Sequence, residues 1–405
     1  MIRAFTNATL VCPVAGVRTG TLVVDGDTIA AVGDVAVPEG AETRDLGGRL
    51  LAPAIVDLGV FAVDPAAFRA GGIVRVGLMP DQSPVLDDPG IVRRAAQMGK
   101  PDIWIHPLAA ATRGLAGADL AEMAVNMGAG ARAVATGREW IADSGVMRKV
   151  LAYAHDCGLA VVAHAEDAGL TAGAVATEGE IATRLGLPAA PAMAEALAIA
   201  RDLMLAEENG ARLHFRQVTT AAGFDLIRAA TRRGVAVTCG ITPAHLMLSD
   251  IAMSDFRTFA HLSPPLRAEA DRRAALAAFG DGTIDVLCSG HDPRGPEEKR
   301  LPFADSSVGM AGAETLLPLA LGLARDNDLP LDRLFAMLAR NPARVLGLDA
   351  GTLQPGTPAD LIVVDRDAPW FVDPQSMAAK AGNTPFDGLP VQGRVLHVMK
   401  GGAFR

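Results

Sequence analysis

The stretch Leu51–Asp64, with the sequence LAPAIVDLGVFAVD, decides the fold of this chain. Its apolar run reaches Asp57 and then continues as Leu-Gly-Val-Phe-Ala-Val up to Asp64. The stretch lies where short strand patterns give way to a long alternation of strand and helix patterns. A buried run at that place is typical of the first strand of a parallel barrel, whose end reaches the face where barrel enzymes carry their chemistry.

Behind this stretch, apolar runs of strand length alternate with helical patterns, and together they make about eight strand–helix units. We therefore predict an α/β protein with a (β/α)8 TIM-like barrel over residues 53–346. The further strands are expected at 73–79, 103–107, 132–135, 159–164, 212–218, 235–240 and 284–289. The helices are expected at 88–98, 118–127, 144–157, 190–208, 221–233, 269–279 and 314–326.

The two chain ends have the composition of short strands and turns. Asp25-Gly26-Asp27 joins two alternating runs, as in a β-hairpin, and residues 360–365 and 395–399 are strand-like. A few strands from one chain end bury too little apolar surface to be stable alone. We therefore predict one small, discontinuous β-sandwich domain that is built from residues 1–52 and 347–405.

Composition limits the classes of function. The 405 residues carry a formal net charge of −9, include one tyrosine and show no Lys/Arg cluster, so nucleic-acid binding is not expected. No apolar run reaches the roughly 18 residues of a membrane span, and the N-terminus lacks the pattern of a signal peptide. The four cysteines are scattered and lack CxxC spacing, which is typical of reduced thiols. We therefore expect a cytoplasmic protein without a membrane segment.

Several phrases, in order along nearly the whole chain, resemble the dihydroorotase branch of the amidohydrolase superfamily, close to allantoinases and hydantoinases. They are LAPAIVDL (51–58), GLMP (77–80), GLAVVAHAED (158–167), VTCGITPAHLML (237–248), LSPPLR (262–267), DVLCSGHDP (285–293), AETLLP (313–318), NPARVL (341–346) and GTPADLIV (356–363). The resemblance implies a barrel enzyme that hydrolyses a cyclic amide. It also implies one or two divalent metal ions, usually zinc, that activate a water molecule at the barrel mouth.

The family's site has His-x-His at the end of the first strand, an arginine just behind it, a bridging carboxylate, two further histidines and an aspartate. The residues of this chain at those positions are, in order, Gly59, Phe61, Val63, Thr136, His164, Gln217 and Gly290. Only His164 among them can bind a metal, and a catalytic zinc needs about three protein ligands. We therefore predict that the metal site is lost, that no cofactor is bound and that no catalytic residue remains. Phe61, if it points inward, fills the space of the metal pair.

A shift of the match by a few residues does not restore the ligands. Near the first strand, only Asp57 and Asp64 could bind a metal. His214, three positions before Gln217, is expected to face the opposite side of its strand. Asp292 could approach the barrel mouth if its loop bends, so the loss at the aspartate position is less certain than the loss of the histidines.

Two hypotheses of different classes follow from these positions. The first is a non-catalytic dihydroorotase-like protein. In some bacteria, inactive dihydroorotase homologues associate with aspartate carbamoyltransferase, so the resemblance implies this enzyme of pyrimidine biosynthesis as partner, in a homo- or hetero-oligomer. The second is an active cyclic amidohydrolase, of dihydroorotase, allantoinase or hydantoinase type, that uses His164, His291 and Asp292 with one zinc ion or none.

A third hypothesis is that a small ligand still binds at the barrel mouth. His164, His291 and Arg294 are candidate residues for such residual binding. Arg294, Arg216 and His164 would together make a cationic pocket for an anion such as a nucleotide. Arg267, in SPPLR, is expected to be structural, because a buried arginine there would pair with a carboxylate or bind carbonyl groups.

Overall fold

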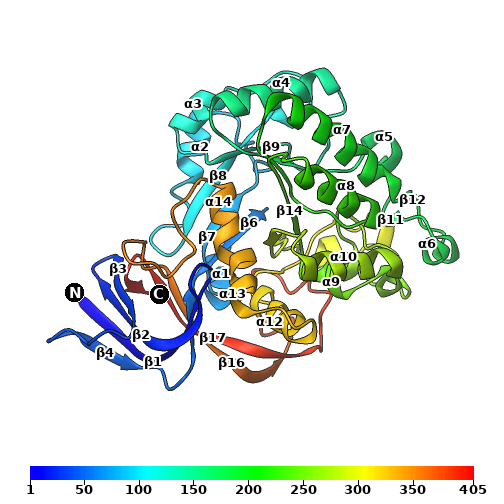
Figure 1. Cartoon of the computed structure of the whole chain (residues 1–405). Coiled ribbons are helices and arrows are strands. Elements are labelled where there is room, and N and C mark those ends of the chain that lie inside the picture. Colours follow the sequence, from blue (N-terminus) through cyan, green and yellow to red (C-terminus); the bar gives the residue numbers. More distant parts are fainter.

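The computed structural model describes residues 1–405 and consists of a large barrel and a smaller β domain (Figure 1). Both chain termini lie in the small domain, where the first and last strands meet in one sheet (Figure 1). No helix is both long and apolar enough to cross a membrane.

The barrel consists of eight parallel strands in the order β6–β7–β8–β9–β10–β13–β14–β15. They are β6 (Ile55–Val60), β7 (Ile73–Leu78), β8 (Trp104–Ala110), β9 (Ala133–Ala135), β10 (Val161–Ala163), β13 (Leu213–Phe215), β14 (Val237–Ile241) and β15 (Val286–Leu287). β6 and β15 are the two ends of this strand order. Just beyond their last residues, the backbone N–H of Phe61 donates to the carbonyl of His291 at 2.9 Å and links the two edges of the sheet. The predicted (β/α)8 barrel is thereby confirmed.

Helices surround the barrel between successive strands. They include α1 (Pro65–Ala70), α2 (Pro89–Ala95), α3 (Met123–Gly128), α4 (Ser144–Asp156), α7 (Met193–Asn209), α8 (Ala221–Arg232), α10 (Glu269–Asp281) and α12 (Leu316–Asp326). After α12, the helix α13 (Leu331–Phe335), a π-helical segment (Ala336–Arg340) and α14 (Asn341–Val345) follow one another. Ala343 and Val345 of α14 pack with residues of the barrel interior, so α14 covers one end of the barrel.

Side chains along the strands alternate between two separate cores. Leu108, Ala133 and Val162 belong to a cluster inside the barrel, whereas their neighbours Val134 and Val161 belong to the larger cluster between strands and helices. This alternation is what a closed parallel barrel requires, because successive residues of a strand point to opposite faces.

The small domain contains one connected sheet of eight strands drawn from both chain ends. They are β1 (Ile2–Cys12), β2 (Gly16–Asp25), β3 (Thr28–Gly33), β4 (Glu42–Asp45), β5 (Leu50–Pro53), β16 (Leu361–Phe371), β17 (Pro390–Lys400) and β18 (Ala403–Phe404). The two chain ends join where β5 pairs antiparallel with β16. A separate core that includes Phe5, Leu10 and Leu361 lies against this sheet.

The loops at the carboxyl ends of the barrel strands carry short elements that the sequence patterns did not predict. They are α5 (Ala168–Thr171), β11 (Ala176–Thr177), α6 (Glu180–Leu185), β12 (Ala189–Ala190), α9 (Pro243–Met247) and α11 (Pro296–Lys299). β11 and β12 pair in parallel as a sheet of their own. Elements of two to six residues are too short to show a periodic pattern in the sequence.

Candidate functional site

The first barrel strand reaches the mouth through a bulge at Gly59. The register between β6 and β7 shifts between Leu58 and Val60, and Gly59 has a φ of +93°, a left-handed conformation that favours glycine. Beyond the bulge, Phe61 packs with the cluster inside the barrel, whereas Val60 packs with the outer cluster. The bulge therefore directs Phe61 into the barrel mouth.

The space beside Gly59 is filled by Arg216. A Cβ atom at position 59 would lie 3.2 Å from Cδ of Arg216 and 3.9 Å from Sδ of Met79. Two guanidinium groups lie over the ring of Phe61, with Cζ of Arg138 at 3.7 Å and Cζ of Arg216 at 5.0 Å from the ring centre. Two cations and an aromatic ring therefore occupy the part of the mouth that the resemblance assigns to a metal centre.

His164 lies at the mouth, but its ring nitrogens already have partners. Nδ1 lies 3.4 Å from an Nη atom of Arg216, and Nε2 lies 3.3 Å from a carboxylate oxygen of Glu166. Thr136, at the position of the bridging carboxylate, accepts a hydrogen bond from the backbone N–H of His164 at 3.0 Å. Both residues therefore serve to fix the ends of β9 and β10.

Gln217 and Gly290 lie side by side at the mouth. A Cβ atom on Gly290 would lie 3.6 Å from Nε2 of Gln217 and 3.0 Å from Cγ2 of Thr242. Both residues line a cavity of about 20 Å³, together with Phe61 and Arg216. A cavity for a small organic ligand measures at least about 300 Å³, so this one has room for very few atoms.

A larger cavity of about 440 Å³ adjoins the small one and shares Arg138 and Ser263 with it. His164 and Glu166 line this larger cavity, but Gly59, Phe61, Gln217 and Gly290 do not. The space for a small molecule therefore lies beside the centre of the mouth.

Val63 and His291 face away from this centre. Val63 packs against the outer core, and its carbonyl accepts a hydrogen bond from Nζ of Lys380 at 2.7 Å. The His291 ring packs edge-on against Phe68, at 5.4 Å between ring centres, and its Nδ1 accepts from the N–H of Ala313 at 3.3 Å. The structure gives His291 a packing role.

Arg294 does not join Arg216 and His164 in a common pocket. Its guanidinium donates to the carbonyl of Val308 at 3.0 Å, to Glu298 at 3.3 Å and to Asp292 at 3.0 Å. Asp292 also pairs with Arg138 at 2.7 Å. The loop after β15 is thus held by ion pairs, and the carboxylate of Asp292 is shared between two arginines.

The carboxylates near the first strand are also bound elsewhere. Asp57 is fully buried and accepts hydrogen bonds from the N–H and the hydroxyl of Ser289, and burial raises the pKa of its carboxyl. Asp64 caps α1 and accepts from the backbone N–H of Lys380 at 2.7 Å. Neither carboxylate turns toward Gly59 to replace a missing ligand.

The expectation for His214 was wrong. His214 points into the barrel, where Nδ1 lies 2.9 Å from Oγ1 of Thr238, and a Cβ atom on Gly240 would lie 3.3 Å from Nε2. Strand alternation does not relate it to Gln217, because β13 ends at Phe215. Burial lowers the pKa of His214 to about 3, so the ring is neutral at physiological pH.

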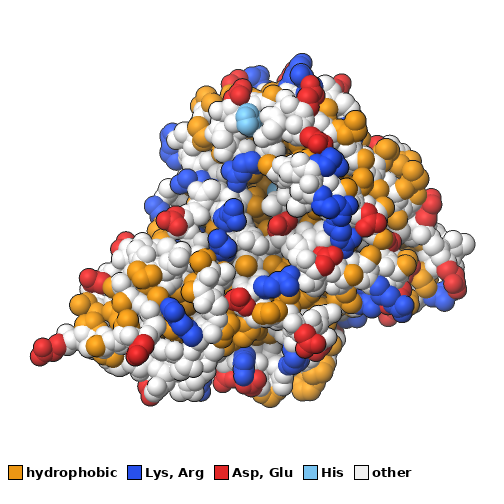
Figure 2. All heavy atoms as spheres, viewed as in Figure 1, with side chains coloured by type: hydrophobic (Ala, Val, Ile, Leu, Met, Phe, Trp, Pro, Cys, Tyr) orange, Lys and Arg blue, Asp and Glu red, His pale blue; other side chains and the backbone are white.

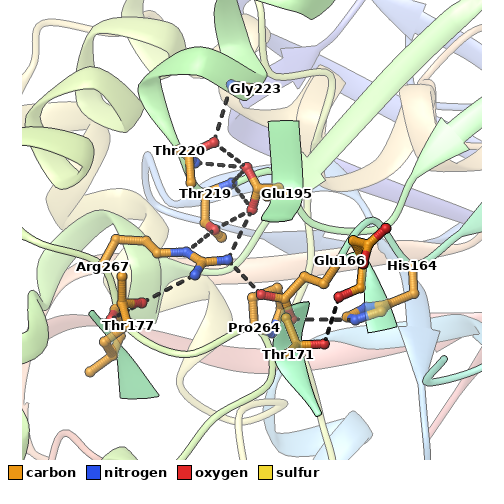
Figure 3. Close-up of polar contacts among 12 residues, drawn as sticks. His164, Glu166, Thr171, Thr177, Glu195, Thr219, Thr220, Gly223, Pro264 and Arg267 are labelled. Carbon is orange, nitrogen blue, oxygen red and sulfur yellow. Dashed lines mark hydrogen bonds and ion pairs between the residues drawn. The ribbon is translucent and has the colours of Figure 1, made fainter. Parts of the chain in front are cut away.

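A buried network of charges supports the wall of the mouth (Figure 3). Arg267 donates to Glu166 at 2.7 Å and lies 3.4 Å from Glu195, as its predicted structural role requires. Glu195, in the first turn of α7, also accepts from the N–H and hydroxyl groups of Thr219 and Thr220. The sequence gives no sign of this role for Glu195, because a lone glutamate at the start of a helix is usually exposed.

These donors do not fit a catalytic zinc ion. No group of three or more His, Cys, Asp or Glu side chains is placed so that it could hold a metal. Zinc needs about three such ligands around one open position, but His164 lies against a guanidinium group. His245, which lines the small cavity, has partners for both ring nitrogens in Thr242 and Pro264. A second cation beside Arg216 would be repelled.

We expect the contribution of Glu166 to the free energy of unfolding to decrease at acid pH. Burial alone would raise the pKa of Glu166, but the hydrogen bond from His164 and the charge of Arg267 outweigh it and lower this pKa to about 2, against 4.5 for an ordinary glutamate. A carboxyl group whose pKa is lower in the folded chain than in the unfolded chain stabilises the fold at pH values above its pKa in the unfolded chain. This stabilisation is lost as the pH falls toward the folded-state pKa of about 2.

In urea unfolding, the advantage of the natural chain over Glu166→Gln should therefore shrink by about 2 kcal/mol between about pH 5 and about pH 3. Glu178→Gln, at an exposed position, is the control and should show no such trend. A constant difference between the natural chain and Glu166→Gln would contradict the proposed charge state.

The barrel, its mouth loops and the β domain from both chain ends define an amidohydrolase architecture. The family model named Amidohydrolase family matches residues 107–404. The dihydroorotase of Pelotomaculum thermopropionicum is 38% identical over 413 residues, which cover 98% of this chain and 96% of that protein. The dihydroorotase of Geobacter sp. (strain M21) is 36% identical over 395 residues, which cover 94% of this chain and 93% of that protein. The chain belongs to the dihydroorotase family of the amidohydrolases.

Solved structures agree with this architecture. The L-hydantoinase (dihydropyrimidinase) of Arthrobacter aurescens superimposes with a TM-score of 0.88 at 24% identity and covers 100% of this chain and 96% of its own. A dihydropyrimidinase of Brevibacillus agri gives a TM-score of 0.84 at 21% identity, over 100% of this chain and 95% of its own. At these identities the likeness shows the fold.

Proposed function

We propose that this chain is a non-catalytic member of the dihydroorotase family, whose barrel has a structural role in pyrimidine biosynthesis. The observation that carries the proposal is the packing of Phe61 and Arg216 at the barrel mouth, which leaves a cavity of about 20 Å³. Cyclic amide hydrolysis by this family needs a metal-activated water and a polarised carbonyl at that place. A pyrimidine-sized ring exceeds this cavity, and the guanidinium groups of Arg138 and Arg216 beside it repel a metal ion.

The electrostatics of the mouth support the same proposal. A zinc site gathers neutral imidazoles and carboxylates around a cation, whereas this mouth gathers guanidinium groups. The guanidinium groups of Arg138 and Arg216 lie over the ring of Phe61, and the carboxylate that lines the cavity, Asp292, is shared between Arg138 and Arg294. The positive charge at this place therefore comes from arginine side chains of the protein, whereas the family's site takes it from a bound metal ion.

The first experiment tests catalysis. The purified chain, incubated with zinc and then freed of loose metal, should retain well below one zinc per chain and should not hydrolyse dihydroorotate above the buffer rate. The dihydroorotase of Geobacter sp. (strain M21), assayed in parallel, is the positive control. About one zinc per chain, with hydrolysis that is lost on chelation, would instead support the alternative of an active cyclic amidohydrolase with an atypical site.

Aspartate carbamoyltransferase is the partner that we propose. An exposed apolar strip on α7, formed by Met193, Leu197 and Met204, supports a protein contact, because isolated soluble chains seldom expose several large apolar side chains together. Leu170 of the neighbouring α5 is also exposed. Figure 2 shows hydrophobic atoms gathered at the edge of the molecule where α5 and α7 lie.

The second experiment tests this partner. A mixture with aspartate carbamoyltransferase at micromolar concentration should elute earlier from a sizing column than either protein alone. Leu197→Glu with Met204→Glu should abolish the shift, because charges would enter the apolar contact. Phe371→Glu, at an exposed apolar position of the small domain, is the matched control and should leave it unchanged. If the natural chain gives no shift, the partner is wrong, while the loss of catalysis stands.

A further inference from the structure

Arg216 is a buried cation without a carboxylate in direct contact. Its side chain is 3% exposed, it forms no ion pair, and its Nε has no hydrogen-bond partner. Its polar contact is with Nδ1 of His164, at 3.4 Å. Burial lowers the pKa of Arg216, which expresses the cost of holding this charge away from water. A buried guanidinium group without a carboxylate partner is costly, and a bound anion would lower that cost.

Other polar atoms around Arg216 are unpaired as well. Oε1 of Gln217 and Oδ2 of Asp81 are buried without a hydrogen-bond partner. Oδ1 of Asp81 accepts from the backbone N–H of Arg138 at 2.9 Å. Both atoms are acceptors that an N–H or O–H group would satisfy, so the unpaired donor at this place is Nε of Arg216.

The carboxylates around the cavity are engaged by other arginines. Arg138 and Arg294 share Asp292, and Arg294 also pairs with Glu298. No carboxylate contacts the guanidinium of Arg216 directly, although Asp81 and Asp292 are close enough to favour its charged form.

The cavity sets a strict limit on the size of a ligand. It measures about 20 Å³, and Gly290 and Gly309 in its lining keep it from closing. One water molecule needs roughly 10–15 Å³ by this measure, so a single atom or a group of two or three heavy atoms fits. The nucleotide that a pocket of Arg294, Arg216 and His164 would have taken is far too large.

We propose that the barrel mouth binds a small monovalent anion, such as chloride or formate, against the guanidinium groups of Arg216 and Arg138. The hydroxyl of Ser263 and the amide of Gln217 also line the cavity and can donate hydrogen bonds, whereas the hydroxyl of Thr242 already donates to Nδ1 of His245 at 2.8 Å. The carboxylate of Asp292 lines it too and opposes the anion. The inference goes beyond the proposed function and does not depend on the carbamoyltransferase.

The test compares anions of different size at equal ionic strength. Sodium chloride and sodium formate should raise the urea midpoint of the full chain in a saturable manner, whereas sodium gluconate, which exceeds the cavity, should not. At an anion concentration of ten times Kd, the ratio of folded to unfolded chain should rise about elevenfold. Equal effects of chloride and gluconate would overturn the proposal and leave water as the occupant.

Two variants sharpen this test. Arg216→Met should abolish the difference between chloride and gluconate, because the cation that holds the anion is gone. Arg148→Gln removes one positive charge from an exposed ion pair with Glu208 and should keep the difference. A full chloride effect in Arg216→Met would overturn the assignment.

A second measurement does not depend on the folding of Arg216→Met. Crystals of the natural chain soaked in sodium bromide should show an anomalous peak within hydrogen-bond distance of the Arg216 guanidinium. Broadening of the chloride NMR signal by the natural chain should be reversed by formate. The absence of both signals would reject the site.

Discussion

Replacing Glu195 with alanine will lower the free energy of unfolding by about 3–5 kcal/mol, the usual cost of breaking a buried ion pair. The carboxylate of Glu195 is fully buried and accepts from both Thr219 and Thr220 while facing Arg267. Its removal leaves a buried guanidinium with one carboxylate fewer and two backbone N–H groups without an acceptor. Urea unfolding, followed by tryptophan fluorescence, measures the change.

The control for this experiment lies on the same helix. Glu207→Ala breaks the exposed ion pair with Arg233 at 2.9 Å and should cost at most about 1 kcal/mol. Similar losses for Glu195→Ala and Glu207→Ala would show that the network beneath the mouth does not hold the barrel wall. Glu195→Gln should fall between the two, because the amide keeps an acceptor and loses the charge.

Replacing Phe61 with alanine will also cost about 3–5 kcal/mol, as for other buried aromatic residues. The change opens a cavity at the mouth and removes the ring over which the guanidinium groups of Arg138 and Arg216 lie. The lost cation–π contacts add to the lost packing.

Phe371→Ala is the matched control, since this phenylalanine is 68% exposed and its loss should change stability by no more than about 0.5 kcal/mol. Phe61→Ala should gain no zinc, because the arginines remain. A Phe61→Ala variant as stable as the natural chain would show that the ring does not seal the mouth.

Much of the fold could be predicted from the sequence, because barrel strands are buried on both faces and give continuous apolar runs. The strand predicted at 73–79 is Ile73–Leu78, and the helix predicted at 221–233 is Ala221–Arg232. The strand predicted at 212–218 is Leu213–Phe215. Residues 216–218 remain buried, and the N–H groups of Arg216 and Val218 still donate to the carbonyls of Ala163 and Gly240, but these residues lie beyond the end of the regular strand.

For the site, the sequence could predict only which metal ligands are absent. The residues at positions 59 and 61 show from their chemistry alone that neither binds a metal, but nothing in the sequence shows what fills the space. In the sequence, Arg216 and Arg294 are both cations near strand ends and nothing distinguishes them, whereas the structure turns Arg294 toward Asp292 and Glu298. Glu195 escaped notice because its partners come from a loop about 25 residues further along the chain.

The pairing of β5 with β16 has a consequence for biosynthesis. Pro53 lies opposite Leu361, so the two partners are separated by 361 − 53 = 308 residues. At a translation rate of about 5–20 residues per second, the ribosome needs roughly 15–60 s to make the intervening chain. During that interval the first strands emerge with an open edge, and the barrel has time to form before the sheet that joins the two ends is complete.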